Sequence, residues 1–167
     1  MLVINFEMFD DAIEELDRRI EELEKEEAFV GVTEAQGQHY SGMTYPELGW
    51  LHANGSEEIG IPERNVAEWG LLTYKGHRKL KKDLKAFLQN LDKRPSISAK
   101  QVNSNWARDF QQHSLTIFGN TNYLESNSTF TQMLKEADGV NPANNPLVWT
   151  GDYKEAWSAW VNNTKVN

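Results

Sequence analysis

A stripe of apolar residues near the start of the chain constrains the fold more than any other feature. Phe9, Ile13, Leu16, Ile20 and Leu23 follow one another at intervals of four, three, four and three residues. This spacing places all five on one side of an α-helix. We therefore expect an amphipathic helix over residues 9–27 that packs through one face, against the body of the domain or a neighbouring subunit.

The same segment carries the net charge of the protein. The formal net charge is −8, and residues 1–27 hold eleven acids against three bases, so the remaining fourteen acids and fourteen bases balance. The three bases are Arg18, Arg19 and Lys25. One interpretation is a solvated acidic face, which is the usual state of such a surface. The other is an acidic surface that lines a channel or meets a basic partner.

Composition limits the kind of protein. A chain of 167 residues is long enough for one domain with a substantial core. The absence of cysteine excludes disulfides, thiol nucleophiles and thiolate zinc sites. No apolar run approaches the ~18 residues of a membrane span, and the N-terminus becomes acidic too early for a signal peptide. We expect a soluble intracellular protein that makes no membrane contact.

The segment after the first helix has the character of strands. β-Branched and aromatic residues at 28–32 predict a strand, and the polar, glycine-containing residues 33–46 predict a loop. We expect residues 48–53 to form a second strand that pairs with the first. Asn54 and Gly55 then mark a turn, because both residues tolerate positive φ.

Residues 66–118 have the pattern of a helical hairpin. The first helix is expected over residues 66–91, with Gly70 and Gly76 weakening its first part. Pro95 ends it, and Ser98 with Gln101 has the form of a capping box that opens the second helix. Two apolar faces support the pair: Leu80, Leu84, Phe87, Leu88 and Leu91 on the first helix, and Val102, Trp106, Phe110 and Ile117 on the second.

Six bases crowd the middle of the first helix of this hairpin. They are Lys75, Arg78, Lys79, Lys81, Lys82 and Lys85. Such a patch suits contacts with phosphates, but it lacks interleaved aromatic residues that would stack on bases, and the whole protein is acidic. A solvated or partner-facing surface is the preferred interpretation. A nucleic-acid-binding protein that uses residues 75–85 is the alternative function.

The last third of the chain is mostly irregular. Residues 119–146 are rich in Asn, Ser and Thr, whose short side chains suit turns, with a short helix expected at 129–137 and ended by Gly139. Trp157 and Trp160 fit either a strand or a short helix, and we favour a strand at the end. The predicted fold is α+β: one domain, residues 1–167, in which a small antiparallel sheet packs against a long N-terminal helix and a helical hairpin.

Nothing in the sequence indicates catalysis. It has no glycine-rich phosphate loop, no His-Glu-x-x-His and no Gly-x-Ser-x-Gly motif. It also contains no recognisable combination of a nucleophilic side chain and an activating base. His52 is the one histidine in a patterned segment, and alone it is more often a structural hydrogen-bonding residue than a catalyst or ligand. We predict a protein that is not an enzyme, with no catalytic residues, cofactor or metal.

Two segments resemble a known family. The first is Trp50-Leu-His52-Ala-Asn-Gly55 followed by Ile61-Pro62-Glu-Arg64; the second runs from Ser128-Thr129 through Lys135, Gly139 and Asn145-Pro146-Leu147 to Thr150-Gly151-Asp-Tyr-Lys-Glu-Ala-Trp157. They are similar to the His-x-x-Gly, Ile-Pro-x-Arg and Thr-Gly segments of tailed-bacteriophage virion morphogenesis and tail-completion proteins. The two segments stand here in the reverse of the family's order.

The resemblance implies a structural role. Such a subunit forms a closed ring, commonly of six copies, at the head–tail junction or tail end, as a neck, tail-completion or tail-terminator protein. Its partners would be further copies, a neck adaptor and tail-tube or sheath proteins, and DNA would pass through the lumen without sequence recognition. The protein would be assembled in the host cytoplasm and reside in the virion.

The same two segments supply the candidate interface residues. Arg64 has two predicted roles: to brace its corner by bonding free carbonyls, or to reach a carboxylate on a neighbour. Pro62 fixes φ, so the chain turns sharply there. Tryptophans near the glycine corners are candidates for subunit contacts. The full set is Trp50, His52, Ile61, Pro62, Arg64, Trp149, Thr150, Gly151 and Trp157.

Overall fold

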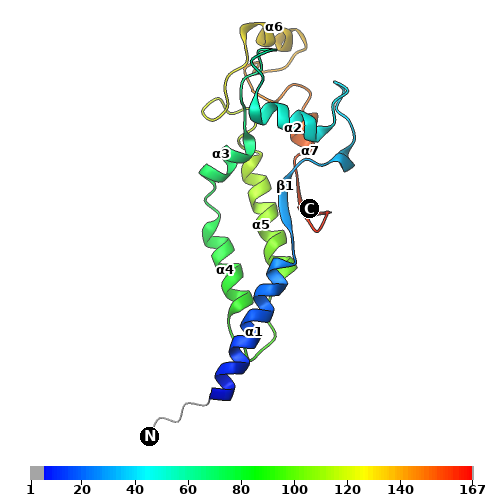
Figure 1. Ribbon diagram of the computed structural model, residues 1–167. Helices are drawn as coiled ribbons and strands as arrows, with labels where there is room; N and C mark the ends of the chain where they lie inside the picture. Colours follow the sequence, from blue (N-terminus) through cyan, green and yellow to red (C-terminus); the bar gives the residue numbers. More distant parts are fainter. Residues whose placement is uncertain (1–5, 167) are drawn as a thin grey trace. The chain divides into compact units, whose positions relative to one another are not determined.

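The computed structural model describes residues 6–166 and has an α+β fold, as predicted (Figure 1). Within these residues there are seven α-helices and a small three-stranded antiparallel sheet. The helices are α1 (Phe6–Glu24), α2 (Tyr45–Asn54), α3 (Val66–Thr73), α4 (His77–Leu88), α5 (Ala99–Ser114), α6 (Thr129–Ala137) and α7 (Asp152–Ala156). The strands are β1 (Ala28–Gly31), β2 (Ser158–Val161) and β3 (Thr164–Val166), and a 3-10 helix spans Glu34–Gln36.

The chain divides into two compact units, each built from segments distant in sequence. Of the described residues, unit 1 contains 6–29, 75–109 and 159–166, and unit 2 contains 30–74 and 110–158. The first predicted element, residues 1–27, begins with residues 1–5, which lie outside the described chain. The expectation of a single domain over residues 1–167 stays a prediction.

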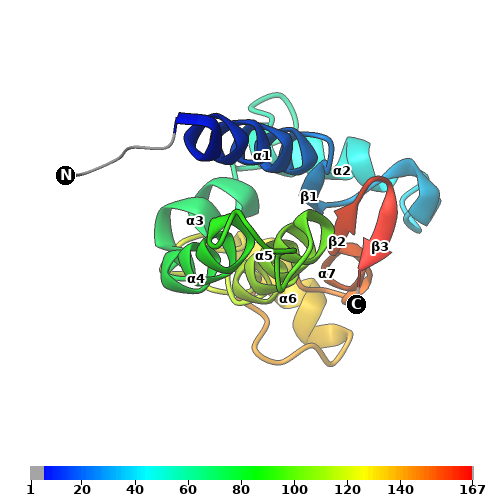
Figure 2. The ribbon, with the colours of Figure 1, turned by 90° about the horizontal axis from the view of Figure 1, so that it is seen from below.

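Unit 1 contains α1, α4 and the first part of α5. Figure 2 shows α4 and α5 side by side as a hairpin, which confirms the helical hairpin for this part of the chain. Their contact is a core of Phe87, Ala99 and Val102, against which Leu23 of α1 and Leu80 of α4 pack. The helix expected over residues 66–91 is interrupted at Tyr74–Gly76, so that α3 and α4 are separate helices in different units.

Helix α1 confirms the predicted helix, but only Leu16 and Leu23 of its apolar stripe are half-buried, whereas Phe9, Ile13 and Ile20 are 62%, 45% and 40% exposed. The helix also contributes a buried cation. Arg19 has no exposed surface, and its guanidinium donates to the carbonyl oxygens of Phe87 at 2.8 Å, Gln89 at 3.0 Å and Lys93 at 2.6 Å. These carbonyls lie at and just beyond the end of α4, where backbone acceptors lack partners within a helix. Arg19 therefore ties α1 to the C-terminus of α4.

The C-terminal strand is also confirmed. All four residues of β2 are buried, and β2 pairs with β3 antiparallel with Ala159 opposite Val166. Asn162 and Asn163 join these strands with φ values of 48° and 59°, the left-handed conformation that a two-residue hairpin turn requires. Phe29 of β1 stacks on Trp160 with ring centroids 6.0 Å apart. A short helix, α7, precedes β2 where the sequence left helix and strand open.

The second predicted strand is wrong, because residues 48–53 lie within α2. Thr44 caps this helix: its side chain accepts from the Glu47 backbone N–H, and the Glu47 carboxylate accepts from the Thr44 N–H. Pro46 occupies the first turn, where its missing N–H costs nothing. These starting signals stand just before the apolar run that we read as a strand. Gly55 ends the helix with φ 67°.

The core of unit 2 gathers residues from most of its length. Leu48, Val66, Ile117, Phe118, Leu124, Tyr153 and Trp157 form one buried cluster. Phe118, Tyr153 and Trp157 pack their rings edge to face at centroid distances of 5.5 to 6.3 Å. Helix α6 has the bounds predicted from the sequence, with Ser128 as its N-cap. This core fixes the positions of α2 and α7, which flank the candidate site.

Candidate functional site

The first motif of the resemblance is one closed loop in unit 2. Gly55 has φ 67°, and a Cβ added to it would lie 2.8 Å from both the Glu63 nitrogen and the Ile61 oxygen. The chain therefore passes directly over Gly55 and leaves no room for a side chain. Ser56 and Ile61 exchange two backbone hydrogen bonds of 2.7 and 2.9 Å, and the Arg64 N–H donates to the His52 carbonyl at 2.6 Å.

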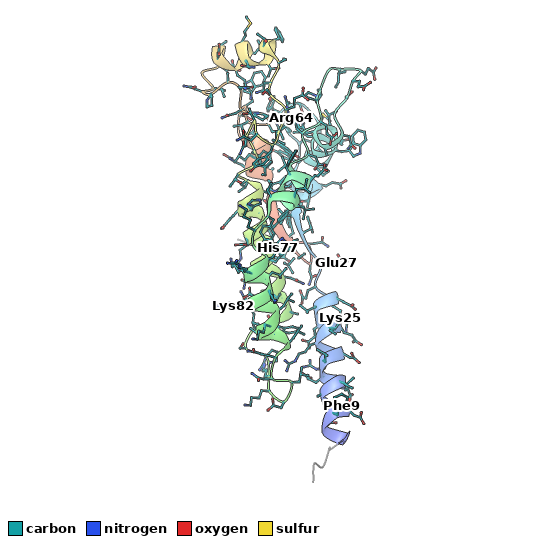
Figure 3. All side chains as sticks on the ribbon, turned by 90° about the vertical axis from the view of Figure 1, so that its left-hand side faces the viewer. Phe9, Lys25, Glu27, Arg64, His77 and Lys82 are labelled. Carbon is teal, nitrogen blue, oxygen red and sulfur yellow. The ribbon has the colours of Figure 1, made fainter. Side chains whose placement is uncertain are left out.

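Arg64 braces this loop from the inside. It is 9% exposed, and it donates from Nε to the Glu125 carbonyl at 2.8 Å and from Nη2 to the Ser126 carbonyl at 2.9 Å. Figure 3 labels Arg64 among the side chains of unit 2. The predicted carbonyl-bonding role is confirmed, although the carbonyls belong to residues just before α6 and not to the corner itself. The second predicted role, contact with a carboxylate on a neighbour, stays a prediction.

The second motif is held by a buried lysine. Lys135 of α6 is 2% exposed, and its Nζ donates to the Asn145 and Val148 carbonyls at 2.6 Å each. Between these two carbonyls, Leu147 has φ 58°, a conformation that a bulky residue rarely adopts. The Asn127 side-chain amide adds bonds to the Ala143 and Asn145 carbonyls at 2.9 and 3.1 Å. The buried side chains of Lys135 and Asn127 thus hold residues 143–148 in a backbone conformation that includes the strained Leu147.

The two motifs line one cavity, which we call the Arg64 pocket. Its volume is 490 Å³. It is lined by His39, Tyr40, Ser41, Met43, Leu48, Leu51, His52, Ile59, Ile61, Arg64, Asn127, Thr131, Lys135, Leu147, Val148, Trp149, Thr150, Gly151 and Tyr153. All of these residues belong to unit 2. Segments that are far apart in the sequence therefore lie side by side here.

Six of the nine predicted interface residues line this pocket: His52, Ile61, Arg64, Trp149, Thr150 and Gly151. Trp50 lies outside it on α2 and is 68% exposed. Pro62 is half-buried next to the lining residue Ile61. Trp157 is 6% exposed in the unit 2 core, where packing accounts for it. The role of all nine in subunit contacts stays a prediction.

The surroundings shift the pKa values of four groups that line the pocket: His52, Arg64, Lys135 and Tyr153. Burial, with a smaller contribution from the charge of Arg64, lowers the pKa of Lys135 to about 8. Burial lowers the pKa of Arg64 as well, with a smaller opposing effect of Glu125. Burial lowers the pKa of His52 to about 4, assisted by the charges of Arg64 and His39, and burial raises the pKa of Tyr153. The pocket therefore disfavours positive charge although it contains two cations.

Sequence reasoning assigned no role to several of these residues. Lys135 belongs to the second motif, and Asn127 belongs to the Asn-rich stretch. Nothing in a single sequence distinguishes a buried lysine from an exposed one. His39 and Tyr40 lie in the predicted loop and reach the pocket through the fold of that loop. A lysine on an otherwise apolar helix face is the only pattern that could have indicated its burial. Helix α6 has nine residues, which is too few for such a pattern to be specific.

Other sites are less developed in the part of the chain that the structure describes. Among residues 6–166, no group of three or more His, Asp or Glu side chains is placed to hold a metal ion. None of the helices formed by these residues is both long enough and apolar enough to cross a membrane. The six bases predicted as the alternative site are all exposed, five of them on α4 and Lys75 just before it, with Lys82 labelled in Figure 3.

Comparisons with known protein families, with curated proteins and with solved structures found no match for this chain.

Proposed function

We propose that the chain is a structural subunit of a tailed phage that forms a closed ring at the head–tail junction or tail end. The observation that carries the proposal is the juxtaposition of its two motifs. Each motif alone is a common combination of turn residues, but in unit 2 they form the walls of one pocket and are held by Arg64 and Lys135. A shared site gives the co-occurrence of both motifs a physical reason.

Exposed apolar side chains in unit 2 support an assembly. Seven large apolar residues, which we call the exposed apolar set, are between 61% and 69% exposed: Tyr40, Trp50, Ile59, Leu71, Leu72, Phe130 and Met133. Neighbouring exposed apolar residues usually mark a contact site, and here Leu71 and Leu72 are adjacent in α3 while Phe130 and Met133 are one turn apart in α6. A ring requires a heterologous contact, in which one surface of a subunit meets a different surface of the next. Contact with neighbouring subunits would remove these side chains from water.

The acidic helix α1 fits the same proposal. Arg18 pairs with Glu15 and Glu22 within the helix, and Lys25, just beyond its end, pairs with Glu21. Most of the other acids are left facing solvent. An acidic surface repels phosphates, which suits a lumen that must let DNA slide without binding it. A basic partner protein would suit this surface equally well.

Charge substitutions in the exposed apolar set test the proposal. Leu72→Glu and Phe130→Glu place a carboxylate on α3 and α6 at positions 69% exposed, so folding stability should change by less than about 0.5 kcal/mol. Self-association should weaken at least about 10-fold, because a charge in an apolar contact loses its water. Gln112→Glu adds the same charge at an exposed polar position of α5 and is the matched control.

Sedimentation or native mass measurements at several protein concentrations provide the readout. If the protein is a monomer under all conditions, including in the presence of phage neck or tail components, the ring proposal is wrong. If Gln112→Glu weakens association as much as Leu72→Glu, net charge and not apolar contact controls assembly, and the proposed interface is wrong.

The alternative function is nucleic-acid binding through α4. The six exposed bases favour it, but Lys79 already donates to Asp109 at 2.8 Å, and the helix also carries Asp83. A protein that neutralises phosphates binds more weakly as salt rises. Lys82→Glu and Lys85→Glu should then reduce both the affinity for DNA at low ionic strength and its salt dependence. The absence of any salt-dependent binding would eliminate this function.

A further inference from the structure

The charges that line the Arg64 pocket are unbalanced. Arg64 and Lys135 are 9% and 2% exposed, and no aspartate or glutamate lines the pocket. Two carboxylates lie outside the lining: Glu125, an exposed residue, acts on Arg64, and Asp138 accepts from the Trp149 indole N–H at 2.9 Å. In a chain of net charge −8, two cations have thus been buried without a carboxylate partner among the described residues. Burying a charge is costly unless an opposite charge or several hydrogen bonds compensate for it.

The backbone compensates for these charges only in part. Lys135 has three N–H donors, and two of them bond the Asn145 and Val148 carbonyls. Arg64 has five, of which the structure pairs one on Nε and one on Nη2 with carbonyls. One N–H donor of Lys135 and three N–H donors of Arg64 therefore have no partner among the described residues. The lowered pKa of Lys135, to about 8, indicates the same incomplete compensation and includes the repulsion from Arg64.

We propose that the Arg64 pocket binds a carboxylate carried on an apolar or aromatic group, with Arg64 and Lys135 as the cations that hold it. The planar guanidinium matches the two oxygens of a carboxylate, and the ammonium supplies a second positive charge. This inference stands on the pocket itself and does not depend on the ring proposal.

The walls of the pocket indicate the rest of the ligand. Leu51, Ile61, Leu147 and Val148 line it together with the Trp149 ring, whose centroid lies 6.0 Å from Lys135 Nζ. An apolar lining with a few convergent polar groups is the usual form of a site for an organic ligand. Inorganic phosphate would neutralise the cations but leave this lining uncovered. A long nucleic-acid backbone does not match cations that are almost wholly buried.

Two further features of the lining are consistent with a binding site. The His52 Nδ1 atom is buried and has no hydrogen-bond partner among the described residues, so one polar atom of a lining residue is left unsatisfied. Leu147 keeps a strained backbone at φ 58° beside the two Lys135 bonds. Strained residues that their surroundings hold in place occur preferentially at functional sites.

The carboxylate has two possible sources with the same chemistry. It is either an acidic side chain or C-terminus of another protein copy, or a free organic acid. Phenylacetate is the probe for both, and phenylacetamide is its neutral match in size and shape. Titration into the full chain at pH 6.5, followed through the indole N–H signal of Trp149, localises binding to the pocket, because Trp149 lines it.

We expect phenylacetate to bind with a Kd of about 1 mM or tighter and to shift the Trp149 signal. Phenylacetamide should bind at least about 10-fold more weakly, because hydrogen bonds to charged groups are the stronger ones. Binding without a change in molecular mass identifies a free acid as the ligand. A fall in the mass of an oligomer on adding phenylacetate identifies the carboxylate of a neighbouring copy.

Variants keep the test independent of folding defects. Lys135→Met should weaken phenylacetate binding at least about 10-fold, with folding checked by thermal unfolding. Because Lys135 also holds the backbone, a second pair is needed: Thr131→Glu places a carboxylate at the pocket and should block the probe, whereas Thr131→Gln has the same size without the charge and should not. Thr131 lines the pocket from the first turn of α6, where the helix tolerates both Glu and Gln.

Three results would overturn the proposal: equal binding of phenylacetate and phenylacetamide, tighter binding of inorganic phosphate than of phenylacetate, or no Trp149 shift together with no change in mass.

Discussion

The sharpest structural prediction compares two glycines of the same loop. Gly55 and Gly60 both have φ 67°, but a Cβ on Gly55 would lie 2.8 Å from backbone atoms of Ile61 and Glu63, whereas a Cβ on Gly60 would meet nothing within 4 Å. Substitution of Gly60 by alanine incurs the cost of a positive-φ residue, about 1 to 2 kcal/mol, less about 0.4 to 1 kcal/mol gained by restricting the unfolded chain. Gly60→Ala should therefore destabilise the protein by only about 1 kcal/mol.

Gly55→Ala carries additional costs. The backbone of Gly55, at φ 67° and ψ −175°, lies in a region that essentially only glycine adopts. To relieve the clash, residues 61–63 must move away, which breaks the two Ser56–Ile61 hydrogen bonds and the bond from Arg64 N–H to the His52 carbonyl. Three such bonds at about 1 kcal/mol each add about 3 kcal/mol, so the total is at least about 4 kcal/mol. Urea unfolding gives the free energy of unfolding of both variants. In thermal unfolding, Gly55→Ala should have a Tm about 6 to 12 °C below that of Gly60→Ala for a chain of this size. Equal destabilisation by the two substitutions would refute the close approach at Gly55.

Two more predictions concern charged groups. Arg19→Met should lower the free energy of unfolding by about 3 to 5 kcal/mol, because it removes a fully buried guanidinium and its bonds to three carbonyls at and beyond the end of α4, of which the Phe87 carbonyl is buried. Arg18→Met, with its side chain 52% exposed on the same helix, should cost far less, and a similar loss for both in denaturant unfolding would contradict the role of Arg19. The pKa of His52 is lowered to about 4 in the folded protein, against 6.5 in the unfolded chain. Between these two pH values the unfolded state binds more protons than the folded state. The contribution of His52 to the free energy of unfolding is therefore complete above pH 6.5 and is lost as the pH falls toward 4. The loss should reach about 1 to 2 kcal/mol at pH 5, and His52→Gln should remove this part of the pH dependence in thermal unfolding, while an unchanged profile would show that His52 is not buried as a neutral group.

Local signals predicted several elements well. The apolar stripe that begins at Phe9 and the Ser128 cap of α6 both act within one helix, so a single sequence contains the information that determines them. Residues 48–53 were misread because a short apolar run is compatible with strand and helix. The capping interaction of Thr44 with Glu47 decides the matter, and it lies just before the run.

The pocket was predictable only in outline. The sequence singled out the segments around Gly55 and Gly151 as two parts of one resemblance, and both segments supply residues that line the same cavity. It gave no sign that Arg19 and Lys135 are buried, because their burial depends on carbonyls that the chain presents from distant positions. Long-range backbone acceptors leave no pattern in the sequence near the side chain that they bind.

The most direct test of the central claim is the state of assembly of the full chain, measured by native mass and electron micrographs, alone and with phage neck or tail components. A closed ring of copies, each of 19.2 kDa, in which Leu72→Glu prevents closure and Gln112→Glu does not, is the predicted result. A particle that remains a monomer in every condition would contradict the account.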